Sequence, residues 1–266
     1  MQRHRVATAC VTRRQRGGRP RRPCPRPAGW RTMASMRHLP HLLVTLWLAA
    51  CTTASPPPPV DASAPAAALA VPAPDALRYR VASEHSAVHF RVYRAGRLAA
   101  LGHNHVVVAR QIEGEIALAP DLARTQFSLR LPVASFEVDP PEARRDAGEG
   151  FEVQPSAEAI AGTRRNMLGA RVLDAERHPE VRIDTVTVRG ALPTPTVTVR
   201  LTLRGVARDA DVPVTVARDG DTLTATATFD IRQTDFGITP MSVFGGALQV
   251  ADAVTVRLRI VATRMP

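Results

Sequence analysis

The sequence predicts an all-β domain over residues 77–266, built as an antiparallel sheet with one apolar and one polar face. Apolar and polar residues alternate along most of this region, which is the pattern of strands that bury one face. Turn signals such as Arg-Asp-Gly-Asp at 218–221 join long alternating segments as hairpins. All three cysteines, Cys10, Cys24 and Cys51, precede the region. Apolar burial, and not disulfides, must therefore stabilise it.

The alternating segments give the predicted strands. Each places mainly Val, Leu, Ile, Phe or Ala on one face and mainly Thr, Arg, Ser or acidic residues on the other. From Tyr79 onward, the expected strands lie at 86–93, 106–109, 112–118, 127–133, 181–188, 197–203, 212–217, 223–231 and 254–260. A meander of this kind packs as a two-sheet sandwich or closes into a barrel, and the alternation does not choose between them.

One segment breaks the alternation. Residues 155–174 begin with Pro155 and Ser156, which are signals for a helix N-terminus, and helix-forming residues follow. Ile160, Met167, Leu168 and Val172 fall on one side of the expected short helix or helix pair. We therefore predict a short helical insertion that caps a barrel end or packs outside the wall.

The basic charge of the chain, formally +11, belongs to its first 50 residues. Eleven of the 35 basic residues lie there with no acidic residue, which leaves 24 basic and 24 acidic residues in the rest of the chain. A domain with balanced charge has no electrostatic bias toward polyanions. The charge distribution thus predicts no nucleic-acid partner.

Residues 36–50 have the features of an export signal. Arg37 supplies a positive start, and an apolar run too short to span a bilayer follows. The run ends in Leu48-Ala49-Ala50-Cys51, which resembles the lipobox of bacterial lipoproteins. That resemblance implies lipidation of Cys51, anchoring in the membrane on the periplasmic face of the cell envelope, and, because Thr52 and not Asp follows, sorting to the outer membrane. An ordinary signal peptide that carries a cysteine is the alternative.

Two further segments lie outside the predicted fold. Residues 1–35 are rich in Arg and Pro, and we treat them as a leader that is either non-native, with Met33 or Met36 as the true start, or disordered. Residues 51–76 are dominated by Pro, Ala and Ser. They read as a linker that holds the domain away from the membrane.

Four separated segments of the domain resemble, in order, the YceI-like family of lipid- and polyisoprenoid-binding proteins. The matching motifs are Glu84-His85-Ser86, Leu173-Asp174-Ala175-Glu176-Arg177-His178-Pro179, Leu201-Thr202-Leu203-Arg204-Gly205-Val206 and Thr234-Asp235-Phe236-Gly237-Ile238. Each motif alone is weak, but the ordered set spans residues 79–263. The resemblance implies a single lipocalin-like antiparallel β-barrel of about eight strands with a long apolar interior.

The resemblance also implies a ligand, an apolar lipid such as a polyisoprenoid or quinone-like chain, with no other cofactor. An aliphatic interior suits a hydrocarbon, because burial of each CH₂ contributes about 0.8 kcal/mol without directional contacts. For any single inward residue, simple core packing is the competing interpretation. The residues expected to line the barrel are Val88, Phe90, Val92, Phe127, Leu129, Leu131, Val199, Leu201, Phe229, Val256 and Leu258.

A few polar residues invite other interpretations. His103 and His105 form an H-x-H pattern and are weak candidates for a metal site, which would make the protein a metal- or haem-associated periplasmic accessory protein. Two histidines that form hydrogen bonds in a loop are the simpler explanation. Arg232 and Asp235 either form an ion pair at the turn before Gly237, which is the favoured interpretation, or contact a polar head group.

No catalytic motif occurs in the domain. It lacks a G-x-S-x-G elbow, an H-E-x-x-H zinc motif, a phosphate-binding glycine loop and a cysteine nucleophile. We therefore predict a binding protein and not an enzyme. A third possibility is a scaffold whose barrel is purely structural, and a cavity too small for a hydrocarbon chain would favour it. The oligomeric state is left open.

Overall fold

The computed structural model describes residues 72–266, which consist mainly of strands. The leader, the signal segment and the proposed lipidation site Cys51 lie outside the described residues. The strands are β1 (Leu77–Val81), β2 (Ala87–Ala95), β3 (His105–Ala109), β4 (Glu113–Leu118), β5 (Gln126–Pro132), β6 (Glu137–Val138), β7 (Glu180–Arg189), β8 (Thr196–Leu203), β9 (Val206–Asp219), β10 (Thr222–Arg232), β11 (Ser242–Val243) and β12 (Leu248–Arg264). The helices are α1 (Pro141–Ala147) and α2 (Ala157–Leu168).

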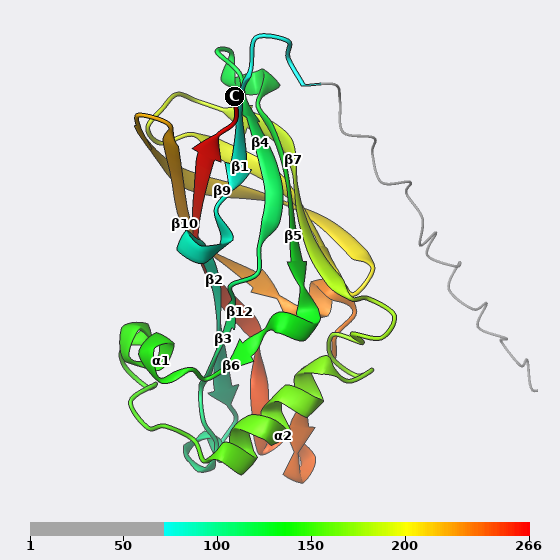
Figure 1. Cartoon of the computed structure of the whole chain (residues 1–266). Coiled ribbons are helices and arrows are strands. Elements are labelled where there is room, and N and C mark those ends of the chain that lie inside the picture. Colours follow the sequence, from blue (N-terminus) through cyan, green and yellow to red (C-terminus); the bar gives the residue numbers. More distant parts are fainter. Residues whose placement is uncertain (1–71) are drawn as a thin grey trace, which may run out of the picture. The chain divides into compact units, whose positions relative to one another are not determined.

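The sheet closes into an eight-stranded antiparallel barrel, which confirms the predicted fold class. Its wall runs β1-β4-β5-β7-β8-β9-β10-β12, and β12 returns to pair with β1. The register at the seam places Tyr79 opposite Arg264 and Val81 opposite Ala262. Closure removes the exposed edges that an open sheet of this length would present. Figure 1 shows β1, β4, β5 and β7 side by side in this wall.

Three further strands, β2, β3 and β6, extend the wall beyond the closed part of the barrel. Strand β12 pairs with β1 near its end and with β2 along its middle, so β1 and β2 form one interrupted strand. The interruption is the 3₁₀ turn Ser83–His85. Ser86, which is buried, secures it by donating to the carbonyl of Ala82 (2.8 Å) and accepting from the amide of Val261 (3.0 Å). Strands β3 and β6 pair onto β2 in turn.

The alternation of the sequence becomes the two faces of the wall. In β8 every second residue is buried, so that Val197, Val199, Leu201 and Leu203 face inward and the intervening threonines and arginine lie on the other face. The inward residues of all the barrel strands join one core cluster.

The two helices lie beside the extension. Helix α2 lies within the predicted insertion, and Ser156 caps it by accepting from the amide of Ala159 (3.3 Å). It contacts β6, and Ile160, Met167 and Leu168 pack against the core (Figure 1). Helix α1 was not predicted; it packs on the outer side of β3 through Ala143, Ala147 and the following Phe151. Within residues 72–266, neither helix has the length and hydrophobicity of a membrane span.

Candidate functional site

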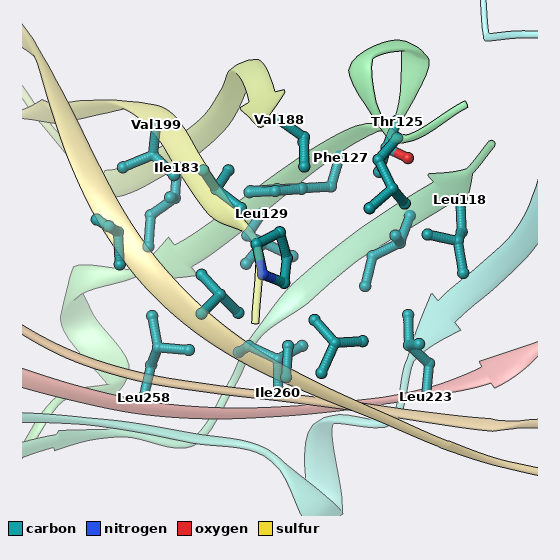
Figure 2. Close-up of a pocket in the computed structure, with 18 of the residues that line it drawn as sticks. Leu118, Thr125, Phe127, Leu129, Ile183, Val188, Val199, Leu223, Leu258 and Ile260 are labelled. Atoms are coloured by element: carbon teal, nitrogen blue, oxygen red, sulfur yellow. The ribbon is translucent and has the colours of Figure 1, made fainter. Parts of the chain in front are cut away.

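The interior of the closed barrel contains a small apolar cavity, here called the first cavity. Its volume is about 100 Å³, and side chains from β4, β5, β7, β8, β9, β10 and β12 line it. Among the described residues that line it, only Thr125 carries a polar side chain, and its hydroxyl already accepts from the amide of Ala119 (3.1 Å). Figure 2 shows side chains of opposite walls pointing into this common space. The first cavity can accommodate an apolar group and offers it no free polar partner.

A second cavity, also of about 100 Å³, lies where the wall extends past the closed barrel. Phe90 of β2 and Phe136, which stack with ring centroids 5.7 Å apart, form part of its wall. Met167 at the end of α2 and Val172 also line it. Its polar lining residue, Gln233, donates to the carbonyl of Ala251 (2.7 Å). This second cavity is therefore also apolar.

One layer of aliphatic side chains separates the two cavities. Along β12, Val254 borders the second cavity and Leu258 the first, and Val256 lies between them. On β8, Leu201 lies between Val199 of the first cavity and Leu203 of the second, and on β5, Leu131 follows Leu129 of the first cavity; neither leucine borders either of these two cavities. All three are buried. We call Leu131, Leu201 and Val256 the dividing layer.

The predicted lining residues fall into three groups, all of them facing the interior. Seven border a cavity: the first is lined by Phe127, Leu129, Val199, Phe229 and Leu258, and the second by Phe90 and Val92. Four pack in the core instead: Val88 and the three residues of the dividing layer. Contact of any of these residues with a lipid stays a prediction.

At its outer side the second cavity continues into a larger depression of about 320 Å³, which we call the histidine pocket; its lining is mostly apolar, with a few polar and basic side chains. The two share Val92, Val107, Met167, Val172 and Gln233. His103, His105 and Arg94 line the histidine pocket together with uncharged residues, and no acidic residue is among the described residues that line it. The apolar second cavity and a mouth that carries basic side chains are therefore contiguous.

A buried ion pair holds His105 in place. Nδ1 of His105 lies 2.6 Å from Oδ2 of Asp139, whose side chain is fully buried. The other oxygen of Asp139 accepts from Nη1 of Arg144 (2.6 Å) and from the amide of Val106 (2.9 Å). Arg144 is buried as well, and it donates to the carbonyls of Asn104 (2.8 Å) and Val153 (2.6 Å). Helix α1 thus fixes the loop that carries both histidines.

The electrostatics of Asp139 follow from these contacts. Burial alone would raise the pKa of its carboxyl group. The hydrogen bonds from His105, Val106 and Arg144 outweigh burial, so the pKa of Asp139 lies below its ordinary value and the group is a carboxylate. Asp139 also has a positive φ of 53°, a left-handed conformation that non-glycine residues adopt at a cost.

The two histidines of the H-x-H pattern lie together in the histidine pocket, with ring centroids 6.4 Å apart. His103 belongs to the loop before β3, and His105 is the first residue of β3. Within residues 72–266, no group of three or more His, Cys, Asp or Glu side chains is arranged to hold a metal ion.

Sequence reasoning missed the residues that position His105. Asp139 lies 34 residues from His105 in the sequence, so no local spacing connects the two. A usable signal was the segment Asp139-Pro140-Pro141, because Pro141 at the first turn of a helix marks the start of α1. The expected ion pair between Arg232 and Asp235 was wrong: Nε of Arg232 contacts Oδ2 of Asp252 (3.1 Å), which the register of β10 on β12 brings near.

The fold and its apolar interior define a lipocalin-like antiparallel barrel, and comparison with known proteins gives the family. The model of the YceI-like domain matches residues 79–262. The chain belongs to the YceI-like family, as the four motifs indicated. No curated protein sequence matches the chain.

Of the solved structures that resemble the chain, BcnA shares the fold with a TM-score above 0.5, and two others are similar with lower scores. BcnA of Burkholderia cenocepacia is 20% identical, with a TM-score of 0.51 over 69% of this chain and 99% of that one. A polyisoprenoid-binding domain from Saccharophagus degradans, implicated in plant cell wall breakdown, is 12% identical, with a TM-score of 0.48 over 71% and 99%. The YceI protein of Campylobacter jejuni is 14% identical, with a TM-score of 0.43 over 60% and 84%.

Proposed function

We propose that this protein binds the hydrocarbon chain of an apolar lipid, of the polyisoprenoid or quinone-like kind, inside its barrel. The observation that carries the proposal is the alignment of two apolar cavities along the inside of the wall, separated by one aliphatic layer. Binding sites for small molecules are concave and largely apolar, with few polar groups at one end. The interior and the histidine pocket have this arrangement.

The size of the cavities defines how binding proceeds. Each is about 100 Å³, smaller than the roughly 150 Å³ that holds one benzene molecule. A chain of many carbons therefore requires the dividing layer to shift so that the cavities join. Its three residues are aliphatic and make no directional contacts that resist such a shift, and each CH₂ of the chain contributes about 0.8 kcal/mol on burial.

An organic extract of the full chain, purified from its native envelope, tests the proposal by mass spectrometry. We expect a stoichiometric lipid with a long hydrocarbon chain. Repeated preparations without lipid, combined with no binding of isoprenoid alcohols to the protein, would show instead that the barrel is only a scaffold.

We further propose that lipidation of Cys51 anchors the protein to the membrane at the periplasmic face of the outer membrane. The lipobox-like segment 48–51 supports this proposal, and two acyl chains suffice for stable anchoring. Replacement of Cys51→Ala should move the protein from the membrane fraction to the soluble periplasmic fraction. Thr53→Ala, two residues away, is the control and should stay membrane-bound; tight association of the Cys51→Ala variant with membranes would contradict the anchor.

A further inference from the structure

The imidazole of His105 is presented to the histidine pocket by one edge. Its Nδ1 faces the buried Asp139, so Nε2 lies on the side of the ring away from that carboxylate. Nε2 has no hydrogen-bond partner among residues 72–266, and the ring lines the pocket with about one-fifth of its side chain exposed. One nitrogen is therefore fixed by the protein, and the other is directed to whatever enters the pocket.

The residues that position His105 cost more free energy than the stability of the fold requires. A buried ion pair such as Asp139–Arg144 contributes little net stability, because desolvation of both charges offsets their attraction. The positive φ of Asp139 adds backbone strain. Buried charge and strain that converge on one partly exposed side chain are typical of a binding or catalytic site, where the contacting group must be held rigidly.

The charge of the pocket indicates which ligand group it suits. Arg144 neutralises Asp139 at 2.6 Å, so the carboxylate does not dominate the surface above it. The ionisable side chains that line the histidine pocket are Arg94, His103 and His105, and all three are basic. Nη1 of Arg94 donates to the carbonyl of Gly102 (2.7 Å), which keeps this guanidinium at the rim. Basic side chains, and no acidic ones, thus line the mouth of an apolar cavity among the described residues.

We propose that the histidine pocket binds the anionic head group, a carboxylate or a phosphate, of an amphipathic lipid whose chain occupies the second cavity. In this arrangement Nδ1–H of His105 donates to Asp139 and Nε2–H donates to an anionic oxygen of the head group, and Asp139 and Arg144 position the ring. Arg94 supplies positive charge, and the imidazole of His103 supplies a further hydrogen-bonding group. This inference rests on the proposed lipid binding and adds the chemistry of the head group.

The test compares ligands that share a chain and differ in the head group. The full chain, stripped of lipid, is titrated calorimetrically in the presence of EDTA with decanoate against decanol, and with farnesyl phosphate against farnesol. The two pairs distinguish carboxylate from phosphate. A hydrogen bond to a charged group is worth about 1.5–3 kcal/mol, which corresponds to roughly ten- to hundredfold in affinity. At least one acid should exceed its alcohol by that factor.

Two variants assign the effect to His105. In His105→Asn the amide N–H replaces Nδ1 toward Asp139, and no atom replaces Nε2. This variant should lose the ten- to hundredfold preference for the acid and bind the alcohol as the wild type does. His85→Asn carries the same change at an exposed histidine of the turn before β2, and it should behave as the wild type.

Each outcome is decisive. If acid and alcohol bind equally and His105→Asn changes neither, the head-group site is wrong while lipid binding stands. If neither ligand of a pair binds, lipid binding itself fails. Acid binding that appears only when a divalent metal replaces EDTA also overturns the proposal. Should His105→Asn not fold, ¹⁵N spectra of the wild-type imidazoles decide: the acid must shift the Nε2 resonance of His105, and the alcohol must not.

Discussion

Asp139 shows how a single residue ties helix α1 to the sheet. It follows β6 directly, and its carboxylate contacts β3 through His105 and Val106 and α1 through Arg144. Of these residues, His105 lines the histidine pocket. Loss of one partner leaves the others with unsatisfied buried charge, so the residues of this group depend on one another.

Removal of the cation tests this dependence. Arg144→Met keeps much of the side-chain volume and leaves the Asp139 carboxylate buried without its partner. We expect a loss of about 3–5 kcal/mol in the free energy of unfolding, measured by urea denaturation. Arg145→Met, at the exposed neighbouring position on α1, should change stability by less than about 0.5 kcal/mol. Equal losses in the two variants would contradict the role of the buried pair.

The lowered pKa of Asp139 predicts a pH dependence. The folded pKa lies below the unfolded value of roughly 3.9. The carboxylate therefore stabilises the fold above about pH 4, and this contribution disappears as the pH falls through the folded pKa. Unfolding free energies of wild type and Asp139→Asn, measured from pH 7 downward, should differ most at neutral pH and converge in acid. Parallel curves would refute the assignment.

At the scale of single elements, the sequence predicted which face of a strand is buried better than it predicted where a strand begins or ends. The alternation in β8 and β10 placed Val199 and Phe229 on the inner face correctly, because a period of two depends only on the strand itself. The same pattern did not reveal that β1 and β2 are two parts of one interrupted strand, because that break depends on pairing with β12. The dividing layer was equally invisible, since Leu131 and Leu129 have the same pattern in the sequence.

The pairing of β4 with β5 depends on a glycine. A Cβ atom on Gly114 would overlap the carbonyl oxygen of Ser128 and lie 2.8 Å from Cδ2 of Leu129. Gly114→Ala must therefore push β5 away, and we expect a loss of about 1–3 kcal/mol. Gly162→Ala is the control, because a Cβ in the middle of α2 meets nothing closer than 3.8 Å. It should raise stability by up to about 1 kcal/mol; thermal unfolding of both variants gives the comparison.

For the whole molecule, the dividing layer links the stability of the fold to the length of hydrocarbon chain that the interior can hold. Leu131→Ala removes part of the layer and joins the two cavities. We expect a loss of about 2–5 kcal/mol in the unfolding free energy of the lipid-free protein, together with tighter binding of long-chain alcohols relative to short ones. Ile112→Ala is the control, because Ile112 is buried in the same core and borders neither cavity. It should lose similar stability without a change in chain-length preference, and the same result for both variants would contradict the dividing layer.

The long strand β12 also determines when the interior can form. It pairs with β1, β2, β10 and β11, and its seam with β1 joins residues 79 and 264. Contacts between such distant parts of a chain form slowly, because loop closure must precede them. Until this seam forms, the inner faces of the strands are exposed and no cavity exists. The late stage of folding is therefore also the stage at which a lipid can be enclosed without passing through a finished wall.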